Sequence, residues 1–96
     1  MVRGEMKSLV ITLEATETGV LGYVYFQETA PGQAARTEEI EPRSVLADYD
    51  ADGRLLGLEF LHAEQADGQL MRDLATRLRL PQLAGLDLAE MCKAPA

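Results

Sequence analysis

The chain has 96 residues, of which 47% are hydrophobic and 26% are charged, a composition that is typical of a globular protein and excludes a disordered or membrane-embedded one. Its formal net charge of −7 at pH 7 argues against nucleic acid and anionic membranes as partners, because both require a positive protein surface. The length predicts a single domain over residues 1–96 with a small core, so we expect association between subunits to add stability.

Neither membrane insertion nor secretion is indicated by the sequence. No apolar run approaches the roughly 20 residues of a membrane span, and the apolar run at residues 9–11 is too short for a secretory signal. Cys92 is the only cysteine, so no internal disulfide can form, as is usual in a reducing compartment. We therefore expect a cytoplasmic protein.

Two strands are predicted in the first third of the chain. From Lys7 to Glu14, Leu9, Ile11 and Leu13 alternate with the other side chains, as in a half-buried strand. From Val20 to Gln27 both alternating rows are apolar or aromatic, so this strand is covered on both sides or presents its second face to another subunit. Gly22 interrupts one row and indicates a bulge or a close approach of another backbone.

The middle of the chain contains a loop and a weaker strand. Residues 28–35 include Pro31 and Gly32 and have the composition of a surface loop. Residues 36–40 predict a short strand, and Pro42 marks a boundary because it cannot donate to a sheet ladder. Charged residues discourage unwanted strand pairing, so the acidic cluster is typical of a solvated sheet edge; it consists of Glu38, Glu39 and Glu41.

The strongest local pattern, from Val45 to His62, predicts a β-hairpin. Asp52 and Gly53 favour a two-residue type I′ turn. This turn pairs Val45 with Phe60, Ala47 with Leu58 and Tyr49 with Leu56, all on one apolar face. The opposite face then carries Leu46, Asp48, Asp50, Leu55, Gly57 and Glu59. Residues 7–63 are therefore predicted to form an antiparallel β-meander of about four strands.

The pattern changes to a helical period in the last third of the chain. Leu70, Leu74 and Leu78 recur every fourth residue, Asp67 is placed to cap the helix, and Pro81 ends it. The following tail is rich in leucine, and Asp87 and Glu90 have the spacing of a capping box for a last helical turn. The fold class is α+β, with a helical segment over residues 67–93, and something must cover the leucines of the tail.

The hairpin also matches the spacing of a calcium-binding EF-hand loop. Its acidic residues follow the pattern D-x-D-x-D-G-x5-E with Asp48, Asp50, Asp52 and Glu59 as ligands. An EF-hand needs a helix on each side of the loop, whereas Pro42 interrupts any entering helix and residues 45–49 alternate like a strand. The hairpin interpretation is favoured, and calcium binding is kept as the alternative.

Other residues give weaker signals of chemistry. His62 is the only histidine and stands at a strand end, which supports an uncharacterised hydrolase only as the weakest alternative. Nothing near Cys92 favours a thiolate, and Ser8 and Ser44 lack the sequence context of a nucleophile. We expect no enzyme, and no catalytic, cofactor-binding or metal-binding residues.

One stretch has a specific family resemblance. Residues 44–63, with Asp50 to Leu61 as the D-x-D-G-x-(L/V)-x-G-(I/L)-E-x-L hairpin, resemble a small bacterial family, domain of unknown function 2283. Tyr23-Val24 and Thr37 to Ile40 fill the places of its earlier strands, so the likeness spans residues 7–63. Val20-Leu21-Gly22 departs from the aspartate usual before the tyrosine, and the chain from Asp67 lies outside the family core. The resemblance implies a small antiparallel sheet, favours the turn over the calcium loop, and supplies no catalytic residues.

The two-sided second strand and the leucine-rich tail together indicate a function in protein association. The expected form is a homo-oligomer, with a dimer favoured, or an acidic partner of a basic protein, such as a toxin-neutralising partner. No nucleic acid, membrane or cofactor is expected.

Overall fold

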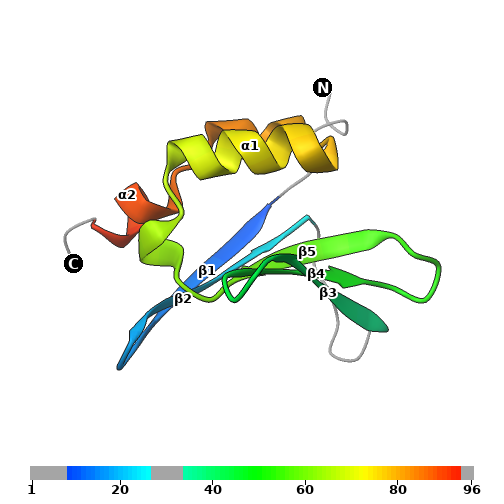
Figure 1. The fold of residues 1–96 in the computed structure, drawn as a ribbon, viewed down its shortest axis with the longest axis horizontal. Helices are drawn as coiled ribbons and strands as arrows, with labels where there is room; N and C mark the ends of the chain where they lie inside the picture. Colours follow the sequence, from blue (N-terminus) through cyan, green and yellow to red (C-terminus); the bar gives the residue numbers. More distant parts are fainter. Residues whose placement is uncertain (1–8, 27–33, 94–96) are drawn as a thin grey trace, which may run out of the picture.

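The fold is an antiparallel five-stranded sheet with one face covered by a layer of helices (Figure 1). The computed structural model describes residues 9–26 and 34–93. The strands are β1 (Val10–Thr16), β2 (Gly19–Tyr25), β3 (Arg36–Glu41), β4 (Val45–Tyr49) and β5 (Leu55–Phe60). The helical elements are the 3-10 helix η1 (Ala63–Gln65), α1 (Gly68–Leu78), the 3-10 helix η2 (Pro81–Gly85) and α2 (Leu88–Cys92). The α+β class is confirmed.

The strand order corrects the predicted meander of about four strands. It is β1-β2-β5-β4-β3, so β5 lies between β2 and β4 and the chain crosses from β2 to the far edge before returning. The composition of the strands explains this order. β5 carries a single charge, at Glu59, and suits the centre, whereas β3 carries four charged residues among six and is tolerated at an edge.

The β4–β5 hairpin keeps two of the three predicted residue pairs. Val45 pairs with Phe60 and Ala47 with Leu58, but Tyr49 pairs with Leu55 instead of Leu56 because the register shifts between Asp48 and Tyr49. Leu55 therefore packs against the core, contrary to its predicted place on the polar face. Leu56 is the extra residue of β5, without a partner in β4, and it compensates for a turn that is one residue longer than predicted.

The turn of this hairpin has three residues, 51–53, and is not the predicted type I′ turn. The amide of Gly53 donates to the carbonyl of Asp50 (3.0 Å), and the amide of Asp50 donates to the carbonyl of Arg54 (2.9 Å). Gly53 has φ of 83°, while Asp52 is not among the residues with positive φ, as a type I′ turn would require. This is a type I turn followed by a left-handed glycine.

Gly22 marks a close approach and not a bulge, since its pairing with Leu13 and Phe60 is regular. A Cβ atom built on Gly22 would lie 2.9 Å from Cβ of Ala63 and 3.2 Å from Cδ2 of Leu13. The missing side chain therefore lets η1 pack directly on β2.

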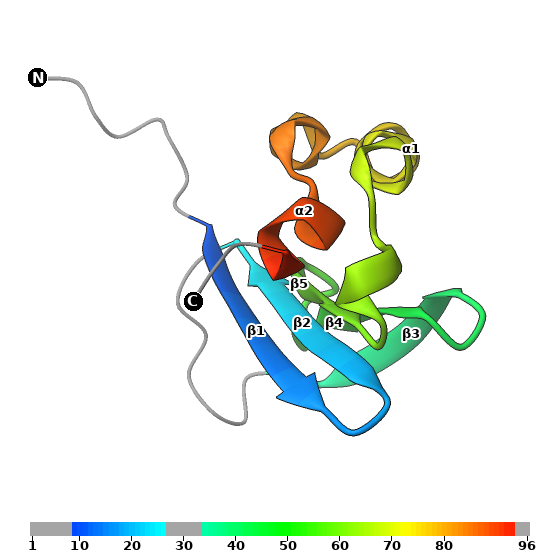
Figure 2. The same cartoon turned by 90° about the vertical axis from the view of Figure 1, so that its left-hand side faces the viewer.

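The helical layer closes the core over one face of the sheet (Figures 1 and 2). The fully buried side chains from the two layers include Leu58 and Phe60 of the sheet and Met71, Leu74, Leu83 and Leu88 of the helices. Leu83 and Leu88 belong to the leucine-rich tail, so the chain itself covers much of the apolar surface that was expected to need a subunit partner. Met91 remains 39% exposed.

Both predicted helix caps are present. The Asp67 carboxylate accepts from the amide of Leu70 (3.0 Å), and the Asp87 carboxylate accepts from the amide of Glu90 (3.0 Å). Helix α1 ends with Arg79 in the left-handed conformation, at φ of 58°, two residues before Pro81. No helix in the described ranges is both long and apolar enough to cross a membrane. Most of the loop predicted at residues 28–35, and residues 7–8 of the first strand, lie outside these ranges.

Candidate functional site

The face of the sheet that points away from the helices is the candidate functional site, and we call it the open face. The strand register fixes its members, because paired residues share a face and successive residues alternate. Its side chains are Val10, Thr12, Glu14, Thr16, Leu21, Tyr23, Tyr25, Thr37, Glu39, Leu46, Asp48 and Glu59. All the described helices lie on the other side of the sheet (Figures 1 and 2).

Asp48 stands at the centre of the open face and is only 5% exposed. The Thr37 hydroxyl donates to its Oδ1 atom (2.7 Å), and the Tyr25 hydroxyl donates to its Oδ2 atom (3.4 Å). These three residues come from three strands, β3, β2 and β4. Hydrogen bonds to both oxygens offset the loss of water around this carboxylate.

Tyr25 reaches Asp48 across the sheet because Gly57 of β5 lies between them. Gly57 pairs with Tyr25 on one side and with Asp48 on the other. A Cβ atom on Gly57 would lie 2.1 Å from Cδ1 of Tyr25, so the ring occupies the space that a side chain would take. The Tyr23 ring stacks beside it, with 5.9 Å between ring centroids and 12° between ring planes.

Glu59 forms a carboxyl pair with Asp48 on the open face. Burial raises the pKa of Glu59 to about 7, and its hydrogen bond with Asp48 and the negative charge of Asp48 add to the effect. Burial also raises the pKa of Tyr25 to about 12, with Asp48 contributing charge and a hydrogen bond. Glu59 is therefore protonated below neutral pH, and the negative charge of the open face increases as the pH rises through 7.

The strand residues of the open face include no lysine or arginine over residues 10–25 and 36–60. Arg36 of β3 lies on the opposite face, where its guanidinium sits 4.4 Å from the centre of the Tyr49 ring and 3.1 Å from Glu38. Arg77 of α1 pairs with Glu41 at the end of β3. The open face is thus both aromatic and acidic.

The acidic residues of the predicted calcium loop do not converge on one point. Asp48 points onto the open face, whereas Asp50 turns its Oδ1 atom toward the amides of Asp52 and Arg54, each 2.9 Å away. Strands β4 and β5 flank the loop in place of the helices of an EF-hand. Within the described part of the chain, no group of three or more His, Cys, Asp or Glu residues is placed to hold a metal ion. The hairpin interpretation is the one that the structure supports.

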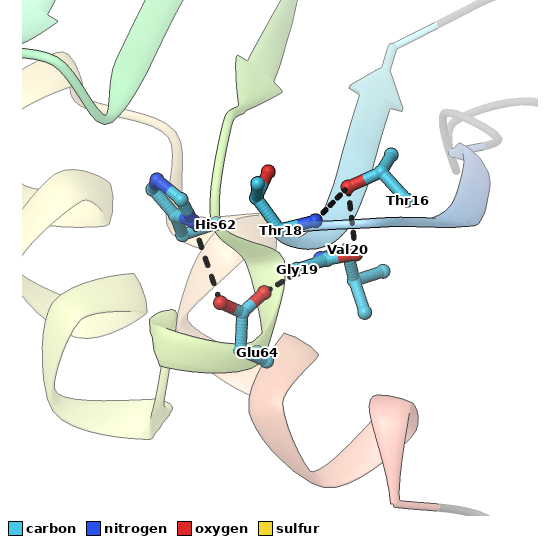
Figure 3. A network of polar contacts seen from close by, with 6 residues as sticks. All are labelled: Thr16, Thr18, Gly19, Val20, His62 and Glu64. Atoms are coloured by element: carbon cyan, nitrogen blue, oxygen red, sulfur yellow. Dashed lines mark hydrogen bonds and ion pairs between the residues drawn. The ribbon is translucent and has the colours of Figure 1, made fainter.

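His62 belongs to a polar network between η1 and the β1–β2 turn (Figure 3). Its Nδ1 atom lies 3.4 Å from Oε2 of Glu64 without the alignment of a hydrogen bond. Glu64 Oε1 accepts from the amide of Val20 (2.7 Å), and this bond is the main reason that the pKa of Glu64 is lowered. The carboxylate therefore ties the helical layer to β2, which is a structural role.

Cys92 is half-buried against the core, and burial raises the pKa of its thiol. Sequence reasoning placed Asp48 and Glu59 on one face but did not find the hydrogen bonds that Asp48 accepts from Tyr25 and Thr37. The bond with Tyr25 depends on the pairing of β2 with β5, which joins residues far apart in the sequence. The glycine at position 57 was the available signal, because it leaves room for a ring from a neighbouring strand.

Comparison with protein families finds one match, described as Protein of unknown function (DUF2283), over residues 22–64. Comparisons with curated proteins and with solved structures find no match. The matched segment runs from within β2 to η1 and contains Tyr25, Asp48, Gly57 and Glu59, whereas β1 and the helices from α1 onward lie outside it. The predicted likeness began too early, at residue 7. The predicted resemblance is confirmed over residues 22–64, which match the model of DUF2283, a family of proteins of unknown function.

Proposed function

We propose that this chain is an association module whose open face binds the surface of a basic protein. One observation supports the proposal above all others. A whole sheet face carries partly buried apolar and aromatic side chains next to four carboxylates, without a positive side chain among its strand residues. Sheet faces whose apolar area is not covered by another layer of the same chain are typical of protein interfaces.

The chemistry of the face indicates what the partner presents. Arginine suits it best, because a guanidinium stacks on tyrosine rings and pairs with carboxylates through parallel hydrogen bonds. Tyr23 and Tyr25 supply the stacked rings, and Glu59 lies directly opposite Tyr23 in the sheet. A basic partner would also be drawn in by the net charge of −7.

A second copy fits the open face less well than a basic protein. Two open faces packed together would bring eight carboxylates into one dry layer, since each copy contributes Glu14, Glu39, Asp48 and Glu59. Like charges in a desolvated interface repel strongly. The negative charge of this face thus favours the basic partner over self-association through the same surface.

Affinity capture from the native host tests the proposal. The tagged wild-type chain is compared with Glu59→Lys on the open face and with Asp73→Lys on the exposed side of α1, which changes the net charge equally. We expect a basic protein to be retained by the wild type and by Asp73→Lys and to be lost with Glu59→Lys. Urea unfolding of each variant verifies that it is folded.

Two outcomes would contradict the proposal. Equal retention of basic proteins by all three chains would show that binding follows net charge and not the open face. Retention of no basic protein by the wild type would remove the proposed partner class altogether.

A further inference from the structure

The two edges of the sheet differ in how they are protected against pairing with another strand. Edge strand β3 has charged residues at four of its six positions, a register irregularity between Glu39 and Glu41, and Pro42 directly after it. Charges, bulges and proline are the usual features that keep an edge strand from adding a neighbour. The β3 edge is therefore closed to further pairing.

Edge strand β1 lacks these features. It is seven residues long, pairs with β2 in an unbroken register, and contains a single charged residue, Glu14. Two of its large apolar side chains, Val10 and Leu13, are each 37% exposed. Among residues 9–26 and 34–93, only β2 pairs with it. A long, regular and apolar edge is a template for another strand.

We propose that β1 pairs antiparallel with β1 of a second copy, with Leu13 facing Leu13 on the two-fold axis, to form a dimer with one continuous sheet. The symmetry limits the choice of register, because an antiparallel pair of identical strands must place some residue opposite itself. The axis at Leu13 pairs all seven residues of the strand, from Val10 opposite Thr16 onward.

The charges of β1 favour this register over its neighbours. With the axis at Leu13, Glu14 faces Thr12 of the second copy, so no two carboxylates lie opposite each other. An axis at Glu14 would place the two glutamates face to face, which is unfavourable. An axis at Thr12 would pair fewer residues of the strand.

A second copy is also the occupant that fits the side chains. Leu13 lies on the helix-covered side, close to Gly22, and Val10 lies on the open face opposite Tyr25. The pairing therefore covers exposed apolar groups on both faces at once. Because edge pairing buries a modest area, we expect association in the micromolar range. This dimer leaves the open face accessible, so its failure would not affect the proposed basic partner.

Sedimentation equilibrium of the full chain, from micromolar to millimolar concentration, tests the dimer with two opposite substitutions. Thr12→Lys places an ammonium opposite Glu14 of the second copy twice in each dimer, and we expect dimerisation to be about fivefold tighter. Thr12→Glu places two carboxylate pairs there, and we expect dimerisation to be at least fivefold weaker. Gln82→Lys and Gln82→Glu, on exposed η2, are the controls matched in charge.

The proposal is supported if Thr12→Lys tightens dimerisation and Thr12→Glu weakens it, each by more than the Gln82 substitution of the same charge. A strict monomer at the highest concentration would overturn the proposal. A dimer whose affinity neither Thr12 substitution changes would also overturn the proposal. So would a dimer that Thr12→Lys weakens, because that result would mean that the two lysines lie opposite each other on the axis. Circular dichroism verifies that each variant is folded.

Discussion

The Glu59–Asp48 carboxyl pair makes the stability of the fold depend on pH, and one substitution can remove this dependence. The pKa of Glu59 is raised from 4.5 to about 7 in the folded chain, so folding favours the protonated form. The resulting stabilisation is complete below the unfolded value of 4.5 and is lost as the pH rises through 7. A shift of this size corresponds to roughly 3 kcal/mol at full burial, and solvent screening of the half-buried side chain reduces it to about 1 kcal/mol.

Glu59→Gln is neutral at every pH and keeps the size of the side chain. We therefore expect it to be about 1 kcal/mol more stable than the wild type at pH 8 and equally stable at about pH 4, where Glu59 is protonated in both the folded and the unfolded chain. Urea unfolding at the two pH values measures the difference. Glu14→Gln, on the same face of the edge strand β1, is the control for removal of a carboxylate. Equal loss of stability at both pH values, or a larger loss at pH 8, would refute the reasoning.

Three further substitutions test the packing and the caps. Gly57→Ala should destabilise the fold by about 1–3 kcal/mol in urea unfolding, because its Cβ would collide with the Tyr25 ring. Gly85→Ala is the control and should be nearly neutral, because its Cβ would meet nothing within 4 Å. Equal effects of the two substitutions would contradict the packing of Tyr25 over Gly57. Asp67→Ala should cost about 1 kcal/mol through loss of the helix cap, and restoration by Asp67→Ser verifies that cause. The Glu64 carboxylate stabilises the wild type above the ordinary glutamate pKa, and this stability is lost as the pH falls through its lowered pKa. Glu64→Gln should remove this contribution, so an unchanged acid limb of the pH–stability curve would contradict the role of Glu64.

Local patterns predicted the elements of this fold better than their arrangement. The helix after Asp67, its cap and the strand at residues 36–40 follow from neighbouring residues and were confirmed. The place of β5 between β2 and β4 depends on which strands suit a buried centre. The acidic composition of residues 36–41 already indicated an edge, and a simple meander would have placed that strand inside the sheet.

The hairpin shows how a local signal can be correct in location and wrong in detail. Asp52 and Gly53 do reverse the chain, but Asp50 accepts from two turn amides and stabilises a three-residue loop. The bulge at Leu56 then restores the register, so the core pairs of Val45 and Ala47 are unaffected. The side-chain contacts of Asp48 on the open face join three strands, and no local pattern predicts such contacts.

Hydrogen–deuterium exchange of the full chain with and without the captured basic protein tests the central claim most directly. The account predicts that binding slows exchange in β2, β5 and β4 around Tyr23, Glu59 and Leu46, and leaves α1 unchanged. Slower exchange confined to α1 and η2, with the sheet unaffected, would show that the partner binds the helical layer and would contradict the account.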